Sequence, residues 1–153
     1  RIGVEKLAPA YRSTALQGGE AIVTRASFQL ARGDAATALA RIRELNERRW
    51  SSLPSGLPNA GSIFRNPPDD YAGRLIEAVG LKGRRNGDAQ ISERHANVIV
   101  NRGRARAVDV LDLMSEARRA VADGFGIELE PEIVLAGTLR DHWTRITEGA
   151  ETV

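Results

Sequence analysis

The segment NAGSIFRNP (59–67) combines small residues, a hydroxyl and an amide in a pattern that could bind a ligand. Gly61 would let a ligand approach the main chain closely. Ser62 follows with a hydroxyl that can donate and accept a hydrogen bond. The same residues also suit a junction between a loop and a strand with a capping serine. The segment is therefore a candidate binding site, and a purely structural role stays open.

Two further segments place polar side chains beside apolar runs. QISERHANVIVN (90–101) gathers amide, hydroxyl and charged side chains around His95, directly ahead of an apolar stretch. Glu130 and Glu132 flank Pro131 at the start of an expected strand, where alternate residues share a face. A single histidine is more often structural than a ligand, and acidic pairs also occur at polar strand ends. Both segments remain candidates on the residues alone.

Charge is distributed unevenly along the chain. Residues 82–106 hold seven basic and two acidic side chains, whereas residues 107–153 hold four basic and ten acidic ones. Such a basic block indicates an anionic partner such as a phosphate, a nucleotide or a nucleic acid, although a solvated surface gives the same pattern. The block contains no aromatic residue. This argues against a single-stranded nucleic-acid platform, which needs stacking surfaces.

Composition excludes several classes of protein. The 153 residues include no cysteine and only His95 and His142, which excludes disulfide scaffolds, thiolate zinc sites and histidine-rich metal centres. We therefore expect no metal site. No apolar run approaches the roughly 20 residues of a membrane span. Because the chain begins with Arg1 and has no leader-like stretch, we expect a piece of a longer protein.

Hydropathy patterns predict the elements that must position these residues. Alternating apolar residues predict strands, and apolar residues three or four positions apart predict helices. A Pro/Gly/Ser-rich linker is expected over 51–58. The tail from Thr138 has no clear period, although His142, Trp143 and Ile146 could dock on the rest of the domain. The predicted strands are 21–30, 61–65, 97–101 and 130–137, and the predicted helices are 35–49, 71–79 and 108–125.

Five motifs, in this order, resemble the C-terminal half of UDP-N-acetylenolpyruvoylglucosamine reductases, also called UDP-N-acetylmuramate dehydrogenases, in their type II form. They are Tyr11-Arg12-Ser13, NAGSIFRNP, AGRLIEAVGLKG (72–83), GDAQISERHANVIVN (87–101) and FGIELEPEIVLAG (125–137). We expect an α+β fold, with a small sheet carrying helices on one face. The resemblance implies that the end of an FAD-binding domain (1–53) precedes a substrate-binding domain (54–137) and a tail (138–153).

The resemblance also implies an activity, cofactors and catalytic residues. Such enzymes of the bacterial cytoplasm use FAD and NADPH to reduce UDP-N-acetylglucosamine enolpyruvate to UDP-N-acetylmuramate in peptidoglycan synthesis. Arg12 would stabilise charge that develops on the substrate carboxylate. Ser62 would protonate the enol, and Glu132 would assist Arg12. Neither nucleic acid nor a membrane would be a partner.

Substrate contacts carry over from the same motifs to Tyr11, Asn66, Lys82 and His95. Arg49, just before the linker, matches a basic position of the family and is a further expected contact. The FAD-binding domains of the same polypeptide would be a further partner, and this chain alone would bind FAD weakly or not at all. The alternative is a non-enzymatic module that binds a nucleotide or nucleic acid through residues 82–106.

Three positions depart from the pattern of the family. Arg65 replaces a more usual lysine, which is a mild change. Asp88 stands where a second glycine is usual, which puts the geometry of that loop in doubt. Arg106 precedes the long helix where a hydroxyl residue is common, and the loss of a cap would cost about 1 kcal/mol.

Overall fold

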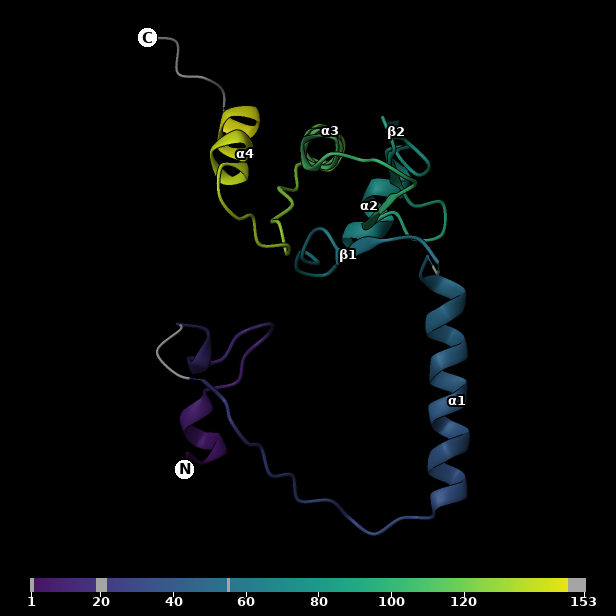
Figure 1. The fold of residues 1–153 in the computed structure, drawn as a ribbon, viewed down its shortest axis with the longest axis vertical. Coiled ribbons are helices and arrows are strands. Elements are labelled where there is room, and N and C mark those ends of the chain that lie inside the picture. The colour runs from purple at the N-terminus through teal and green to yellow at the C-terminus, as the bar shows by residue number, and fades with distance from the viewer. Residues whose placement is uncertain (1, 19–21, 55, 149–153) are drawn as a thin grey trace. The chain divides into compact units, whose positions relative to one another are not determined.

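The computed structural model describes residues 2–18, 22–54 and 56–148. They fall into two compact units that divide between Ala38 and Leu39. Figure 1 shows the course of the chain, and each unit is described here by itself. No helix in the described ranges has the length and apolar character needed to cross a membrane.

The first unit contains little regular structure. Two short 3-10 helices, η1 (Val4–Leu7) and η2 (Ala15–Gly18), flank a bridge between Ala10 and Ser13. The strand predicted over 21–30 is wrong: residues 22–34 are coil, and position 21 lies outside the described residues. A strand needs a neighbour for its main-chain groups. The described residues supply none here, and the side chains of Ile22 and Phe28 are 90% and 83% exposed.

Helix α1 (Ala35–Ser52) confirms the helix predicted over 35–49 and extends it by three residues. Its start is fixed by Asp34, whose carboxylate accepts a hydrogen bond of 2.7 Å from the Thr37 main chain. This bond favours the charged carboxylate and lowers the pKa of Asp34. The apolar stripe of α1 is exposed, at Leu39, Ile42 and Leu45.

Four antiparallel strands form the sheet, in the order β1-β4-β3-β2. Gln90 lies opposite both Arg85 and Val100, so β3 is a central strand. β4 confirms the strand predicted over 97–101, whereas β1 lies two residues earlier than the predicted start at 61. The strands are β1 (Asn59–Ser62), β2 (Arg85–Asn86), β3 (Ala89–Ile91) and β4 (Val98–Asn101).

The tight hairpin between β2 and β3 was not predicted from the sequence. Asn86 pairs with Ala89, so only Gly87 and Asp88 form the loop. Gly87 has a φ of +56°, in the left-handed region that glycine adopts without strain. The carboxylate of Asp88 accepts a hydrogen bond of 2.8 Å from the Arg104 main chain. Asp88 therefore fastens this loop to the turn after β4, which answers the doubt about its geometry.

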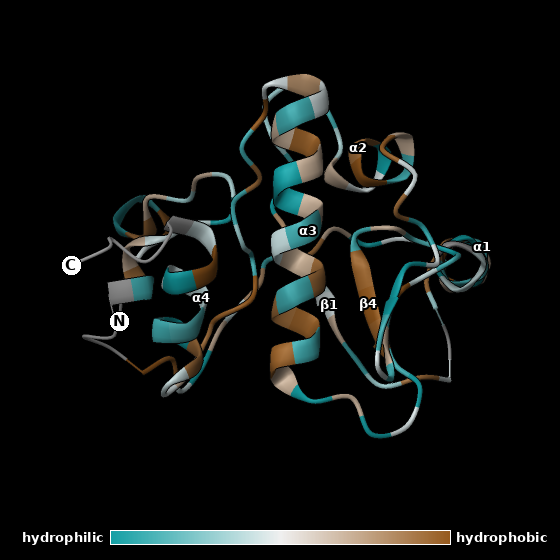
Figure 2. Ribbon diagram, turned by 90° about the horizontal axis from the view of Figure 1, so that it is seen from above, coloured by the Kyte–Doolittle hydropathy of each residue, from teal (hydrophilic) through white to brown (hydrophobic). Residues whose placement is uncertain are grey.

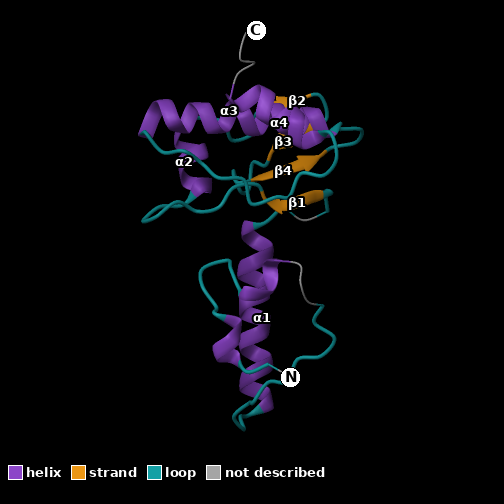
Figure 3. Cartoon of the chain, turned by 90° about the vertical axis from the view of Figure 1, so that its left-hand side faces the viewer, coloured by secondary structure: helices purple, strands orange, loops and turns teal. Residues whose placement is uncertain are grey.

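Three helices complete the second unit: α2 (Ala72–Ala78), α3 (Ala107–Phe125) and α4 (Leu139–Glu148). The first two confirm the predicted helices, and α4 was not predicted. α3 packs on β2 and β3, and both α2 and α4 pack on α3 (Figures 2 and 3). The fold is thus the expected small sheet with helices. Its largest fully buried side chains are Phe64, Ile63, Leu75, Ile76, Ile91, Leu111, Leu113, Met114, Leu129, Val98 and Val121.

The strand predicted over 130–137 is wrong. Only one bridge forms, between Phe64 and Pro131. Proline has no N–H with which to continue a ladder, and the chain then leaves the sheet, so that the Val134 side chain is 89% exposed.

The start of α3 compensates for its missing hydroxyl cap. The Asp109 carboxylate accepts hydrogen bonds of 2.8 Å from the Arg106 main-chain N–H and 2.7 Å from the Arg106 guanidinium. The same bonds lower the pKa of Asp109. Asp109 is negatively charged and lies in the first turn, where its charge also interacts favourably with the positive end of the helix dipole. The expected loss is therefore offset within the first turn of the helix.

Candidate functional site

A hollow of about 430 Å³ lies where the end of β1, the start of α2 and the loop before β4 meet. It brings together three residues predicted to bind or convert a substrate: Ser62, Asn66 and His95. Most of its lining is polar. The remaining lining residues are Tyr71, Gly73, Arg74, Glu77, Arg94, Ala96 and Asn97.

Ser62 ends β1, opposite Val98 on the neighbouring strand. Within the described residues its hydroxyl makes no hydrogen bond, so that it can bind a ligand. Ile63 accepts a hydrogen bond of 2.8 Å at its carbonyl from the Glu132 main chain. Glu132 thus lies across from Ile63, the residue that follows Ser62, although 69 positions separate Glu132 from Ile63 in the sequence.

The two carboxylates around Pro131 differ in their surroundings. Glu130 pairs with Arg65 at 3.6 Å, and both side chains are exposed. Glu132 is half-buried beside Ile63. The structure therefore distinguishes Glu132, the residue that the family motif indicates, from its exposed neighbour.

Asn66 fixes the start of α2. Its side-chain oxygen accepts a hydrogen bond of 3.1 Å from the Ala72 main chain. An asparagine in this position satisfies a main-chain N–H that has no partner within the helix. Asn66 thus orients the helix that forms one wall of the hollow.

His95 is held in one tautomer. Its Nδ1 accepts a hydrogen bond of 3.3 Å from the Asn97 main chain, so the proton of the neutral ring is on Nε2. The loop is tightened by Ser92, whose hydroxyl accepts from the Arg94 and His95 main chains at 3.1 and 3.3 Å. Gly73 leaves room for the ring, because a Cβ there would lie 3.2 Å from the His95 Cε1. His95 can therefore present an N–H donor.

The charged side chains of the hollow are partly paired. Asp70 binds Arg74 one turn along the chain and also accepts a 2.7 Å hydrogen bond from the Tyr71 main chain. The Arg74 bond, followed by the Tyr71 bond, lowers the pKa of Asp70 to about 2. Arg94 has no carboxylate partner among the described residues. An anion that entered the hollow would meet an available guanidinium.

Lys82 reaches the hollow only indirectly. Its Nζ lies 2.8 Å from the Glu77 carboxylate, and Glu77 lines the hollow. Arg49 lies in the last turn of α1 and does not line the hollow.

Tyr11 and Arg12 belong to the first unit. Their side chains contact each other, with the guanidinium carbon of Arg12 6.0 Å from the centre of the Tyr11 ring. The Gln17 side chain donates a hydrogen bond of 3.0 Å to the Arg12 carbonyl. The roles of both residues toward a substrate stay predictions.

Sequence reasoning missed Tyr71, Arg74 and Asn97 as lining residues. Positions 70, 73, 74 and 77 are spaced as residues on one helix face. From this spacing, Arg74 and Glu77 could have been predicted to line the site. Asn97 was noted only as part of a polar stretch.

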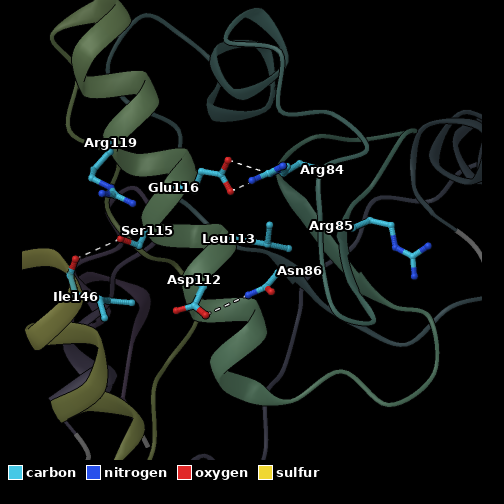
Figure 4. Close-up of a pocket in the computed structure, with 9 residues that line it drawn as sticks. All are labelled: Arg84, Arg85, Asn86, Asp112, Leu113, Ser115, Glu116, Arg119 and Ile146. Carbon is cyan, nitrogen blue, oxygen red and sulfur yellow. Dashed lines mark hydrogen bonds and ion pairs between the residues drawn. The ribbon is translucent and has the colours of Figure 1, made fainter.

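The basic block contributes much of its charge to ion pairs within the domain. Arg84 pairs with Glu116 at 2.9 Å, and Arg85 lies 3.7 Å from Asp88. A second hollow, of about 670 Å³, lies between β2, α3 and α4. In Figure 4, Arg84 and Asn86 face acidic residues of α3, whereas Arg85 points away. Paired cations of this kind are poor evidence for a nucleic-acid surface.

No group of three or more potential metal ligands occurs in the described part of the chain.

The sequence model of one protein family, the C-terminal domain of UDP-N-acetylenolpyruvoylglucosamine reductases, matches residues 53–136. The chain belongs to this reductase family. The resemblance seen in the sequence is thereby confirmed, and a non-enzymatic module is not favoured.

Reductases of the same name show how much of the protein is matched. The chain is 51% identical to UDP-N-acetylenolpyruvoylglucosamine reductase 2 of Symbiobacterium thermophilum. The match covers 88% of this chain and 45% of that protein. It is 48% identical to the reductase of Chloroflexus aurantiacus, over 85% of this chain and 45% of that one. The chain thus spans about half the length of these relatives.

A solved structure supports the fold of this reductase domain. The crystal structure of UDP-N-acetylenolpyruvylglucosamine reductase from Thermus caldophilus matches with a TM-score of 0.69 and 42% identity. The match covers 86% of this chain and 47% of that one. The α+β fold expected from the sequence is therefore confirmed.

Proposed function

We propose that this chain provides the substrate-binding domain and catalytic side chains of an enzyme that reduces UDP-N-acetylglucosamine enolpyruvate to UDP-N-acetylmuramate. The observation that carries the proposal is the hollow that brings Ser62, Asn66 and His95 together, with Glu132 beside Ile63. The reaction belongs to peptidoglycan synthesis in the bacterial cytoplasm.

The hollow suits an anionic sugar nucleotide. Arg94 offers a guanidinium, which can bind phosphate oxygens in a bidentate manner. His95 offers its Nε2 proton, and Asn66 borders the same space. We assign Lys82 an indirect part, through Glu77, and Arg49 and Tyr11 a part in binding through other regions of the substrate.

Ser62 acts in this proposal as the proton donor. FAD that NADPH has reduced would, when bound, provide the hydride for one carbon of the enolpyruvyl double bond. The electron pair of that bond moves toward the carboxylate, where Arg12 stabilises the charge with help from Glu132. The Ser62 hydroxyl then gives its proton to the neighbouring carbon. We place FAD and NADPH in the portion of the relatives that this chain does not match, in FAD-binding domains of the same polypeptide.

The test measures NADPH oxidation by the protein expressed from the full coding sequence that contains this chain, with and without the enolpyruvyl nucleotide. Ser62→Ala should lower kcat at least ~100-fold because a proton donor acts in the transition state, and it should leave substrate binding nearly unchanged. Stopped-flow absorbance and equilibrium binding separate the two effects.

Ser51→Ala is the matched control, since the Ser51 hydroxyl is exposed and, among the residues that the structure describes, bonds only the Arg48 carbonyl, at 2.8 Å. It should behave as the unaltered enzyme. NADPH oxidation that does not depend on the nucleotide, or a fully active Ser62→Ala enzyme, would overturn the proposed function.

A further inference from the structure

Asn97 connects the two functional sides of the hollow. Its side chain is buried, with a residue exposure of 3%. The amide oxygen accepts a hydrogen bond of 3.0 Å from the Phe64 main chain, and the amide nitrogen donates one of 2.7 Å to the Phe64 carbonyl. One side chain thus satisfies both main-chain groups of a residue 33 positions away.

The main chain of Asn97 makes two further hydrogen bonds. Its carbonyl accepts from the Ile63 main chain at 3.0 Å, and its N–H donates to Nδ1 of His95 at 3.3 Å. The first bond fixes the residue that follows Ser62. The second fixes the tautomer of His95. Ser62 and His95 are therefore tied to the same buried residue.

Residues 63 and 64 are held from both sides. On one side Asn97 binds them as a neighbouring strand would. On the other, the Ile63 carbonyl accepts from the Glu132 main chain at 2.8 Å. The pairing of β1 with β4 has an irregular register between Asn59 and Ser62. Just beyond this irregularity, the Asn97 side-chain amide makes the hydrogen bonds to the Phe64 main chain that a paired strand would otherwise make.

We infer that Asn97 is a positioning residue that sets the placement of the Ser62 hydroxyl relative to the His95 Nε2 proton. The inference rests on the proposed function for its catalytic meaning. The side chain must accept at one atom and donate from another to match the Phe64 N–H and carbonyl, and among residues of this size only asparagine carries both groups on separate atoms. An ionised aspartate would turn an acceptor toward the Phe64 carbonyl.

Asn101 provides a matched control at the last position of β4, the strand that Asn97 immediately precedes. Its side-chain oxygen accepts from the main chains of Gly103 and Ala105, at 2.9 and 3.1 Å. Both bonds need only an acceptor, which an aspartate also supplies. Asn97→Asp and Asn101→Asp are therefore the same chemical change with opposite expected consequences.

Amide hydrogen exchange tests the clamp without any ligand. In the 153-residue chain, the Phe64 amide and the Asn97 side-chain protons should be protected. Asn97→Asp should speed Phe64 exchange about tenfold or more at neutral pH. The carboxylate can still accept from the Phe64 N–H, but it repels the Phe64 carbonyl, which has lost its donor, and this repulsion separates the two residues. Protection should return in acid, where the protonated carboxyl can donate again. Asn101→Asp should leave Phe64 unchanged.

Steady-state kinetics of the flavin-containing enzyme test the positioning role. Asn97→Asp should lower kcat by about tenfold or more with little change in KM, and activity relative to the unaltered enzyme should rise as the pH falls. Asn101→Asp should retain kcat.

Unchanged Phe64 exchange in Asn97→Asp would overturn the inference whatever the enzyme does. Equal kcat values for the two variants, with Phe64 exchange perturbed, would also overturn it. If Asn97→Asp does not fold at neutral pH, rapid exchange of the Asn97 side-chain protons in the unaltered chain would overturn it instead. An unaltered enzyme without nucleotide-dependent activity would overturn the proposed function alone, and the exchange data would still decide on the clamp.

Discussion

The ion pair between Asp70 and Arg74 makes the stability of the second unit depend on pH in the acid range. In the folded protein the pKa of Asp70 is lowered to about 2, from 3.8. A lowered carboxyl pKa adds stability that is complete above the unfolded value and is lost as the pH falls through the folded one. The contribution of Asp70 should therefore disappear between about pH 4 and pH 2.

Urea unfolding of the unaltered chain and of Asp70→Asn measures this contribution. The variant should be less stable at about pH 5, and the two should converge near pH 2. Asp69→Asn removes the same charge from an exposed neighbour that, within the described ranges, makes no bond to Arg74, so its difference from the unaltered chain should stay smaller. A constant gap between the Asp70→Asn protein and the unaltered chain at every pH would contradict this explanation.

At the scale of elements, the β2–β3 hairpin depends on one glycine. Gly87 has a φ of +56°, and a Cβ at this position would lie 3.3 Å from the Asp109 carboxylate. Gly87→Ala should therefore lower the free energy of unfolding by about 1–2 kcal/mol, the usual cost of a left-handed alanine. Thermal or urea denaturation measures the loss.

Gly124→Ala is the control for the hairpin variant. Gly124 lies in α3, and a Cβ there would make an ordinary contact of 3.4 Å with Val79. An alanine in a helix should stabilise the protein by up to about 1 kcal/mol. A stabilising Gly87→Ala would show that the strain attributed to this loop is absent.

The elements predicted correctly are those whose pattern is local and complete. α3 repeats apolar residues every three or four positions, and β4 is a continuous apolar run. The 22–30 segment has an equally regular alternation, but it has no neighbouring strand among the described residues. The β2–β3 hairpin is short, and its Gly87-Asp88 loop was the available signal. α4 is largely polar, and only its docking residues were anticipated.

The residues alone indicated 59–67 and 90–101 as candidates, and only the family motifs joined them into one site. Ser62 and Asn66 belong to one segment and His95 to another, and nothing in the spacing of the two segments requires them to meet. The pairing of β1 with β4 brings Ser62 opposite Val98, close to the His95 loop. Asn97 could not be recognised from the sequence, because its role depends on contact with Phe64.

On the scale of the whole molecule, the two units should differ in their resistance to protease. Arg25 and Arg32 lie in exposed coil without main-chain bonds to other described residues. Arg102 and Arg104 are also exposed, but their main-chain N–H groups bind Asp88, each at 2.8 Å. Trypsin should therefore cleave after Arg25 and Arg32 first, because cleavage requires an extended, unbonded chain.

Mass spectrometry of a brief digest identifies these sites. Asp88→Ala is the matched variant, since it removes the carboxylate that binds the Arg104 main chain and should speed cleavage after Arg104. Early cleavage after Arg104 in the unaltered chain, ahead of Arg25, would contradict the expected order.

The uncovered segment 22–34 has a consequence for the behaviour of the chain in solution. Its main chain from 22 to 33 makes no hydrogen bond within the described residues, its side chains alternate between apolar and polar, and Phe28 and Leu30 are exposed. Such a segment is a template on which another molecule can add a strand, and Arg25 and Arg32 oppose this addition only by their charge. Self-association through this segment, and not the melting of the sheet, should set the concentration at which the isolated chain stays dispersed.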